Sequence, residues 1–415
     1  MNFFWIDNKR DLNVDYMTFF KEVLREGQNN IFILEKNPYL VFLSLLRNLA
    51  CGQKSILLDS DFSREELQSL ELSEEAICQG SYYQNNLNSK FNNYEDLLEY
   101  LKNEENQLQI EIFTSGTAGR PKRVKQTLKN ITRAVKIDKA FKNKVWGFAY
   151  NPTHFAGLQV FFQAFSNKNT IVYLFNKDYL MVYEDLVKHK ITHLSCTPTF
   201  MKMLLPNMKN KVKSMESLTF GGEKFDRSLE NRIKEKFTQS IINNVYASTE
   251  AGSLLKAEGE YFVIPNRYVD LIKIEDNELL IHKELLGVSS SFYLVGSWYK
   301  TGDLVKLEDD KRFKFVSRKS DMINVGGYKV NPSEVEEVII QIEGVKNVYV
   351  FGRKNSVLGN IVIANIIKED SFDETELMNR VKKVTQDQLQ QFKIPRKINF
   401  VDSFNLTRTG KIKKI

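Results

Sequence analysis

Apolar residues near the start of the chain recur in a pattern that predicts a strand, a helix and a second strand over residues 30–60. The run N-I-F-I-L-E is short and apolar, and P-Y-L-V-F-L-S-L-L-R-N-L-A has helical spacing, with Gly52 where a helix should stop. S-I-L-L-D then has the character of a buried strand. We therefore expect an α/β unit in this region.

Strand and helix patterns alternate through the middle of the chain. Residues 108–127 predict two strands joined by a glycine-rich loop. Further strands are predicted at 168–175, 192–197 and 217–220, and helices near 178–190 and 198–205. This alternation is typical of a parallel sheet covered by helices.

The pattern changes after residue 260. Residues 260–316 are rich in short strands and turns, which indicates a small β-rich subdomain. Beyond them, N-P-S-E-V-E-E-V-I-I predicts a helix that opens with a capping-type serine and an acidic first turn, and V-K-N-V-Y-V-F and N-I-V-I-A-N-I-I predict strands. We therefore predict an α/β fold. Its large N-terminal domain (residues 1–316) combines parallel-rich α/β subdomains with the β-rich one, and a small α+β C-terminal domain (residues 317–415) follows.

The composition fits a globular protein of two or more domains. The chain has 415 residues, of which 42% are hydrophobic and 27% are charged. The N-terminal M-N-F-F-W-I-D-N-K-R mixes charges into its apolar start, so we expect no signal peptide. The apolar stretch from Tyr39 to Ala50 is broken by Arg47 and is too short to span a bilayer.

The cysteines, the histidines and the net charge further limit the possible compartment, metal sites and partners of the protein. Cys51, Cys78 and Cys196 have no paired spacing, which is typical of a reduced cytoplasm, and the four histidines form no ligand cluster for zinc. The net charge of +7 suits polyanions such as ATP and CoA, but we favour the interpretation of a lysine-rich surface. The basic residues form no aromatic-interleaved patch, so we expect no nucleic-acid partner.

Five short segments carry the chemistry of the chain. They are F-T-S-G-T-A-G-R-P-K at 113–122, F-G-G-E at 220–223, Y-A-S-T-E at 246–250, Y-K-T-G-D at 299–303 and T-R-T-G-K at 407–411. Any one of them can be a turn, but all five in this order indicate a site that binds ATP and presents a carboxylate to it. In the first segment, small residues let backbone N–H groups approach phosphate oxygens, although the spacing is not that of a Walker A loop.

This ordered set resembles the superfamily of adenylate-forming enzymes, which includes acyl- and aryl-CoA synthetases, adenylation domains of peptide synthetases and firefly luciferase. The resemblance runs from about residue 30 to Lys411. It implies that the chain uses ATP and Mg²⁺ to activate a carboxylic acid as an acyl-adenylate, releases pyrophosphate, and transfers the acyl group to a thiol, CoA being the expected acceptor. It also implies a mobile C-terminal domain and, because the segment before the phosphate loop is short, a trimmed N-terminal subdomain.

The resemblance assigns the nucleotide to residues of the first four segments. The first segment would hold the β- and γ-phosphates, the second and Tyr246 would pack on the two faces of adenine, and Asn244 would read the adenine amino group. Asp303 and Arg318 would bind the ribose. The predicted ATP-binding residues are Thr114, Ser115, Gly116, Thr117, Gly119, Lys122, Gly221, Gly222, Glu223, Asn244, Tyr246, Ala247, Ser248, Asp303 and Arg318.

Four residues are the predicted catalytic group. The resemblance implies that Lys411 bridges the attacking carboxylate and the α-phosphate, as a flexible cation can. Thr249 would donate to the α-phosphate, and Glu250 would bind Mg²⁺ as a hard oxygen ligand. His154, in P-T-H-F-A-G-L, matches an aromatic gate beside the substrate carboxylate.

Further positions concern the acid, the thiol and domain movement. His154, Phe155 and Gly157 form the predicted acid pocket, and Phe155 stands where amino-acid-activating members carry an aspartate. An α-amino-acid substrate is therefore disfavoured. Gly326 and Gly327 match the strand that lines the thiol tunnel, where a side chain would block passage. Ser320 stands at the hinge position, where the family usually has Asp or Lys.

Several alternatives stay open at this point. The thiol can be the pantetheine of a carrier protein instead of CoA, and the acid can be an aryl acid, a short acyl chain or a succinylbenzoate-like acid. Ala118 and Arg123 depart from the family pattern in the phosphate loop, which would permit a catalytically idle nucleotide-binding homologue. The intact Lys411, Glu250 and Asp303 argue against that class.

Overall fold

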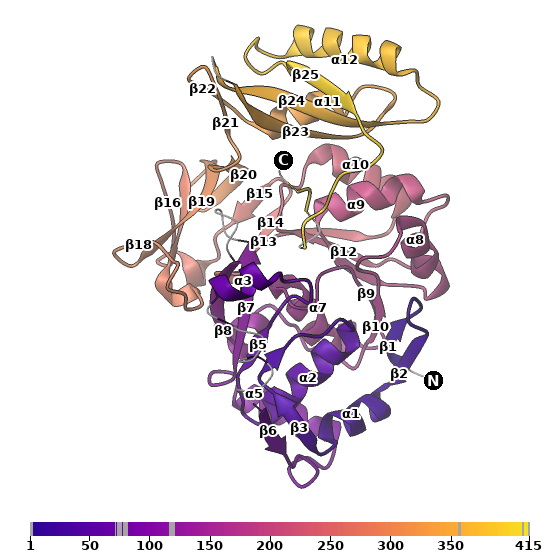
Figure 1. Cartoon of the computed structure of the whole chain (residues 1–415), viewed down its shortest axis with the longest axis vertical. Helices are drawn as coiled ribbons and strands as arrows, with labels where there is room; N and C mark the ends of the chain where they lie inside the picture. Colours follow the sequence, from indigo (N-terminus) through magenta and orange to yellow (C-terminus); the bar gives the residue numbers. More distant parts are fainter. Residues whose placement is uncertain are drawn as a thin grey trace.

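The computed structural model describes residues 3–70, 72, 77, 82–115, 121–355, 358–408 and 411–413. Within them the chain folds into a large α/β part and a small α+β C-terminal domain, which lies at the top of Figure 1. This confirms the predicted fold class. The C-terminal segment returns from the small domain toward the large part, so the last described residues lie against both (Figure 1).

A 14-stranded mixed sheet forms the scaffold of the large part. Its central strands β10, β9, β11, β12 and β13 are parallel. They span Thr170–Tyr173, Val145–Phe148, His193–Cys196, Ser217–Gly221 and Ile241–Ser248. Beyond β10 lie β1 and β2, which span Phe3–Asp7 and Leu12–Asp15.

Helices connect these strands where the apolar pattern predicted them. Helices α7, α8, α9 and α10 span Phe155–Ser166, Tyr179–Lys188, Pro198–Leu204 and Arg227–Lys236. The strands expected at 168–175, 192–197 and 217–220 and the helices expected near 178–190 and 198–205 are therefore confirmed. Because the strands are parallel, their carboxyl ends meet at one edge, where binding sites of such sheets are found.

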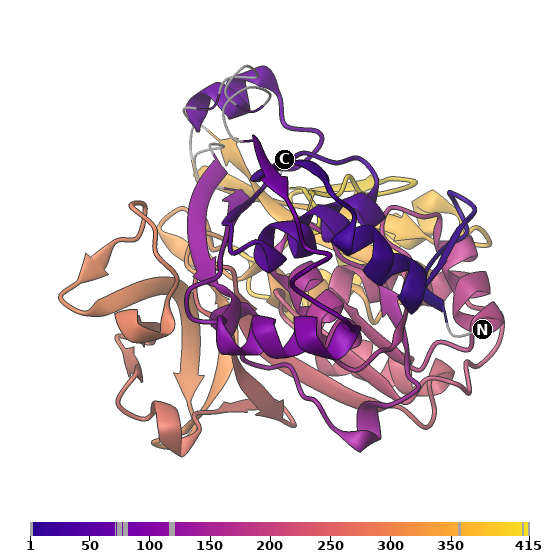
Figure 2. The same ribbon diagram turned by 90° about the horizontal axis from the view of Figure 1, so that it is seen from below.

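The other half of the large sheet is antiparallel, which confirms the short strands expected after residue 260. Figure 2 shows these strands, in orange, beside the α/β layers. Strands β14, β15, β16, β17, β18, β19 and β20 span Gly252–Glu258, Tyr261–Val263, Ile272–Glu275, Glu278–His282, Leu294–Val295, Trp298–Leu307 and Arg312–Arg318. Short 3₁₀ helices η1, η2, η3 and η4 span Lys139–Phe141, Leu205–Asn207, Asn266–Tyr268 and Lys283–Leu285.

The N-terminal unit contains the strand, helix and strand expected over residues 30–60. Its sheet has the order β4, β5, β7, β8, over Phe32–Ile33, Ser55–Leu57, Gln109–Ser115 and Pro121–Thr127. Around it lie α1, α2, α3, α5 and α6, over Tyr16–Leu24, Pro38–Ala50, Arg64–Ser69, Tyr94–Asn103 and Leu128–Thr132, and the pair β3 and β6, over Gly27–Asn30 and Tyr82–Asn85. Helix α2 ends as expected, because Gly52 has φ +70°.

Aromatic residues join this unit to the large sheet. The rings of Phe42 on α2 and Phe161 on α7 stack with centroids 4.0 Å apart, and Phe148 of β9 packs edge-on against Phe42. Most of α7 is buried, so its apolar sequence serves mainly the core. Gly157 on this helix is required by packing, because a Cβ there would lie 2.3 Å from the carbonyl oxygen of Asn151.

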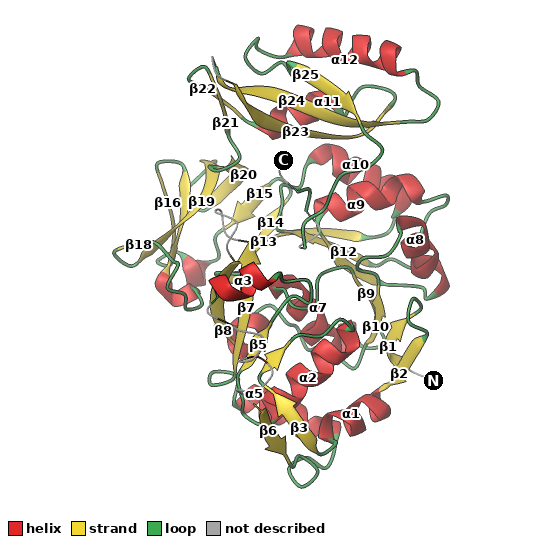
Figure 3. Ribbon diagram, in the orientation of Figure 1, coloured by secondary structure: helices red, strands yellow, loops and turns green. Residues whose placement is uncertain are grey.

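The C-terminal domain is a five-stranded sheet with two helices along it (Figure 3). Strands β21 to β25 span Ile323–Val325, Tyr328–Val330, Val345–Asn355, Gly359–Lys368 and Lys397–Phe400, and α11 and α12 span Pro332–Ile339 and Glu374–Gln388.

The prediction that a serine caps helix α11 is wrong. Asn331 is the N-cap, and its side chain accepts from the Ser333 N–H, because Pro332 occupies the first helical position.

The predicted division after residue 316 falls inside β20, and the next sheet begins at Ile323. The exact boundary therefore stays a prediction. Within the described residues, every helix is either too short or too polar to cross a membrane.

Candidate active site

A cleft of about 1940 Å³ lies between the parallel strands, the β-rich strands and the C-terminal domain. This volume exceeds that of a typical single-ligand pocket, so the cleft has room for two substrates. Many of the predicted site residues line it. They are Thr114, Lys122, His154, Phe155, Gly221, Gly222, Glu223, Ala247, Ser248, Thr249, Glu250, Arg318, Ser320 and Lys411.

Lys411 enters this cleft above the carboxyl end of β12. Its Nζ donates a hydrogen bond of 2.6 Å to the carbonyl oxygen of Gly222, which has φ +80°. Burial lowers the pKa of Lys411, while the nearby carboxylate of Glu223 raises it. Glu223 is itself fixed, because its Oε2 accepts from the Thr199 N–H at 2.9 Å. Two of the five segments thus meet in space.

Strand β13 places alternate residues on opposite faces. Asn243, Val245 and Ala247 line the cleft, whereas Asn244 and Tyr246 are not among its described lining residues. Tyr246 is only 9% exposed, and burial raises the pKa of its phenol. The adenine contacts expected of Asn244 and Tyr246 stay predictions.

Asp303 is buried and joins strands β13 and β20. Its Oδ2 accepts from the Tyr246 hydroxyl at 2.6 Å, and its Oδ1 accepts from Arg318 Nε at 2.9 Å. Asp303 and Arg318 are register partners on β19 and β20. The two residues predicted to hold the ribose are therefore already paired, and a nucleotide would have to share the Asp303 carboxylate with Arg318.

The segment of Thr249 and Glu250 is held from behind by Gln126, which sequence reasoning missed. The buried Gln126 Nε2 donates to the carbonyl oxygens of Thr249 and Glu250, at 2.7 and 3.1 Å. Its own Oε1 accepts from Asn130 Nδ2 at 3.0 Å. These bonds fix the backbone of the T-E pair and leave the two side chains to face the cleft.

The phosphate loop is described only at its two ends. Thr114 and Lys122 are register partners on β7 and β8, and both line the cleft. Gly116, Thr117, Ala118 and Gly119 lie outside the described residues, and nothing is described of the Ser115 side chain. Arg123, the second departure from the family pattern, forms an ion pair with the buried Glu111, which gives this arginine a structural reason.

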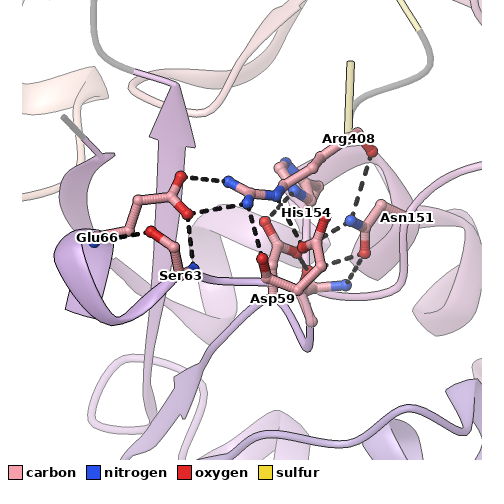
Figure 4. A network of polar contacts seen from close by, with 8 residues as sticks. Asp59, Ser63, Glu66, Asn151, His154 and Arg408 are labelled. Carbon is pink, nitrogen blue, oxygen red and sulfur yellow. Dashed lines mark hydrogen bonds and ion pairs between the residues drawn. The ribbon is translucent and has the colours of Figure 1, made fainter. Parts of the chain in front are cut away.

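His154 belongs to a polar network that includes an unpredicted carboxylate (Figure 4). His154 Nε2 lies 3.1 Å from Asp59 Oδ2, and Asp59 also accepts from Asn151 Nδ2 at 2.9 Å and from the Thr153 hydroxyl. Burial raises the pKa of Asp59, but the hydrogen bond to His154 and the other donors outweigh it, so the pKa lies below its ordinary value. Asp59 thus fixes the orientation of the His154 ring at the cleft.

The predicted hinge residue lies between the two parts of the chain, and the predicted thiol-tunnel glycines form the turn between β21 and β22 of the C-terminal domain. Ser320 is exposed between β20 and β21, and its hydroxyl donates to Asp321 Oδ1 at 2.9 Å. Gly326 and Gly327 have φ +57° and +90°, so both positions favour glycine through backbone conformation. They are not among the described residues that line the cleft. Their roles in thiol passage and in movement stay predictions.

Comparisons with known proteins agree with this arrangement. Residues 31–269 match the family of AMP-binding enzymes, and residues 334–411 match the C-terminal domain of AMP-binding enzymes. The chain belongs to this family, which confirms the resemblance drawn from the five segments.

Similar proteins include ligases that join 2-succinylbenzoate to CoA. The chain is 26% identical over 331 residues to a 2-succinylbenzoate–CoA ligase of Staphylococcus epidermidis, covering 73% of this chain and 68% of the relative. It is also similar to the o-succinylbenzoate CoA synthetase of Bacillus subtilis, solved with its acyl-adenylate intermediate (TM-score 0.69, 20% identity, covering 99% and 94%). A second structure of that enzyme holds ATP and a magnesium ion (TM-score 0.67, 19% identity, covering 99% and 95%).

Proposed function

We propose that this protein is an AMP-forming acid–thiol ligase that joins a carboxylic acid to CoA. The observation that carries the proposal is the position of Lys411, whose Nζ rests on the Gly222 carbonyl in the cleft that Thr249 and Glu250 also line. Membership in the AMP-binding family and the likeness to 2-succinylbenzoate–CoA ligases support it.

The first half-reaction forms an acyl-adenylate. An oxygen of the acid carboxylate attacks the α-phosphorus of ATP, the bond to the bridging β-oxygen breaks, and pyrophosphate leaves. Lys411 supplies a cation between the carboxylate and the α-phosphate, and Thr249 donates to the α-phosphate. This lowers the barrier by positioning and by electrostatic stabilisation, without a covalent bond to the protein.

The residues present suit a magnesium ion that travels with the nucleotide. Magnesium is commonly held by one or two carboxylates together with substrate phosphates. Glu250 offers one such carboxylate at the cleft, and its backbone is fixed by Gln126. No cluster of three metal-binding side chains occurs among the described residues, so the phosphates would complete the site. When bound, the ion would neutralise charge on the triphosphate.

In the second half-reaction a thiol attacks the acyl carbon, a thioester forms and AMP leaves. We propose CoA as the thiol, and transfer to a carrier-protein pantetheine is the alternative. Pyrophosphate release measured with and without CoA, using 2-succinylbenzoate first and then other acids, tests the proposal. Acid-dependent release with CoA thioester as product is expected. Thioester formation on a carrier protein alone would favour the alternative, and no release with any acid would favour an idle nucleotide-binding protein.

The acid should lack an α-amino group. Phe155 is 4% exposed and lines the cleft. In the described part of the chain, the cleft residues contributed by α7 and by 133–136 include Arg133 and Lys136 but no carboxylate. A buried ammonium without a partner costs several kcal/mol. We therefore expect an acid with an apolar or aromatic body to have a higher kcat/KM than the same acid carrying an α-amino group. A panel in which the amino acid is the better substrate would contradict this expectation.

Ser320→Pro should impair the two half-reactions unequally. Proline fixes φ near −65° and removes a backbone donor, so it should restrict a pivot between β20 and β21. Pyrophosphate release measures the first half-reaction, and thioester formation from a chemically supplied acyl-adenylate measures the second. Equal loss in both assays, or no loss in either, would show that Ser320 is not the pivot.

A further inference from the structure

The guanidinium of Arg408 connects the segment that carries Lys411 to the N-terminal unit (Figure 4). Arg408 Nε donates to Asp61 Oδ1 at 2.7 Å, and Arg408 Nη2 donates to the Asp61 carbonyl at 3.0 Å. Its two terminal nitrogens also contact the two carboxylate oxygens of Glu66, at 2.6 and 3.0 Å. The guanidinium lies 4.9 Å from the centre of the Phe62 ring. Such a bidentate fork is specific to arginine and is stronger than a single ion pair.

These contacts perturb the groups that make them. The hydrogen bond from Arg408, opposed by desolvation and helped by the Ser63 N–H, lowers the pKa of Glu66 to about 2. The Glu66 carboxylate is therefore charged at neutral pH, and the pair weakens only as the pH falls from the ordinary range of glutamate toward 2. The ion pair between Arg408 and Glu66 is therefore present at the neutral pH at which ATP-dependent activity is measured.

Backbone contacts join residues 405–407, next to Arg408, to residues 411–413, so a fixed Arg408 also fixes Lys411. The Thr407 N–H donates to the Lys411 carbonyl at 2.6 Å, and the Lys413 N–H donates to the Asn405 carbonyl at 2.7 Å. Leu406 and Ile412 form an isolated antiparallel bridge. Lys411 Nζ, at the other end, reaches the Gly222 carbonyl.

The segment 59–66, which contacts Arg408, also contacts His154 of the predicted acid pocket. Asp59 orients His154 at 3.1 Å, and Asp61 and Glu66 hold Arg408 only a few residues further along. Asn151 joins the two sides, because its Nδ2 donates to Asp59 Oδ1 at 2.9 Å and lies 3.4 Å from the Arg408 carbonyl oxygen. Residues 59–66, which follow β5 and include the first turn of α3, therefore contact both His154 and the segment that carries Lys411.

We propose that Arg408 is a positioning residue for adenylate formation: its fork onto Asp61 and Glu66 seats Lys411 over the cleft. This inference rests on the proposed ligase function. This positioning of Lys411 affects the first half-reaction alone, because the thiol step acts on an acyl-adenylate that has already formed and no longer needs the lysine cation. Arg408 is not among the described residues that line the cleft, and its effect is transmitted through the backbone contacts between residues 405–407 and 411–413.

The test compares Arg408→Gln with Arg380→Gln, which removes a guanidinium of α12 whose ion pairs among the described residues, with Glu376 and Glu343, lie within the C-terminal domain. Arg408→Gln should lower kcat for acid-dependent pyrophosphate release by about 10–100-fold, since small displacements of a positioned group cost this much. The KM for ATP and thioester formation from a supplied acyl-adenylate should be unchanged. Arg380→Gln should leave all three unchanged.

Amide hydrogen exchange gives a readout that does not depend on activity. Peptides covering 405–413 should exchange faster in Arg408→Gln and in Glu66→Gln than in the unmodified protein. The exchanged-charge variant Glu66→Arg with Arg408→Glu should regain part of the protection.

Unchanged exchange at 405–413 in Arg408→Gln would overturn the proposal, and so would equal loss of both half-reactions. If the unmodified protein releases no pyrophosphate with any acid, the ligase function fails. The exchange measurement then still decides whether Arg408 seats the segment.

Discussion

Lys411→Ala should lower acid-dependent pyrophosphate release by about 10²–10³-fold, the usual loss for one transition-state electrostatic donor. The C-terminal segment brings the Lys411 Nζ into the cleft, where it lies on the Gly222 carbonyl. Thioester formation from a chemically supplied acyl-adenylate should survive, because in that step the thiol attacks the acyl carbon and no carboxylate has to be held against the α-phosphate.

The matched control is Lys397→Ala, which removes an exposed lysine of β25 in the same domain and should leave both rates unchanged. The pH profile gives a second check. Because burial lowers the pKa of Lys411, the rate should fall on the alkaline side below the ordinary lysine range of about 10.4. Unchanged pyrophosphate release in Lys411→Ala would remove the central catalytic assignment.

Glu250→Gln should raise the Mg²⁺ concentration needed for half-maximal pyrophosphate release by about 10–100-fold or more, since even residues that only support metal ligands have effects of this size. The amide keeps the shape of the side chain and removes its charge. The backbone should stay in place, because Gln126 holds the carbonyl oxygens of residues 249 and 250. A magnesium titration of the rate measures the effect.

Glu258→Gln serves as the control for that titration, since Glu258 ends β14 at an exposed position outside the cleft-lining residues. Its magnesium dependence should match that of the unmodified protein. An unchanged titration in Glu250→Gln would rule out the metal role of Glu250. The magnesium ion would then have no predicted protein ligand.

The parts of the fold that sequence predicted are those with local causes. Helix α2 was expected because its apolar spacing and its Gly52 stop are local features of the sequence, and the Asn37 N-cap seen in the structure is equally local. The two strands around the phosphate loop and the alternating strands and helices that follow have equally local patterns. Capping was the local detail that failed, since two polar residues flank Pro332 and only the backbone geometry selects Asn331 over Ser333.

The parts of the site that sequence did not predict depend on contacts between distant residues. His154 and Asp59 are 95 residues apart, and Arg408 and Asp61 are 347 residues apart. Neither carboxylate lies in a recognisable motif, and a single aspartate in a loop usually faces solvent. Gln126 was missed for the same reason, because its partners are backbone carbonyls 123 and 124 residues away. One available signal was the cluster of Asp59, Asp61, Glu65 and Glu66 directly after a buried strand.

The most direct test of the whole account is exchange of radiolabelled pyrophosphate into ATP by the intact protein, measured with 2-succinylbenzoate and with the acid left out. Exchange reports the reversal of adenylate formation and needs no thiol. The account predicts label in ATP only when the acid and Mg²⁺ are present, and loss of that label in Lys411→Ala. Binding of ATP without acid-dependent exchange for any acid tested would contradict the proposed ligase.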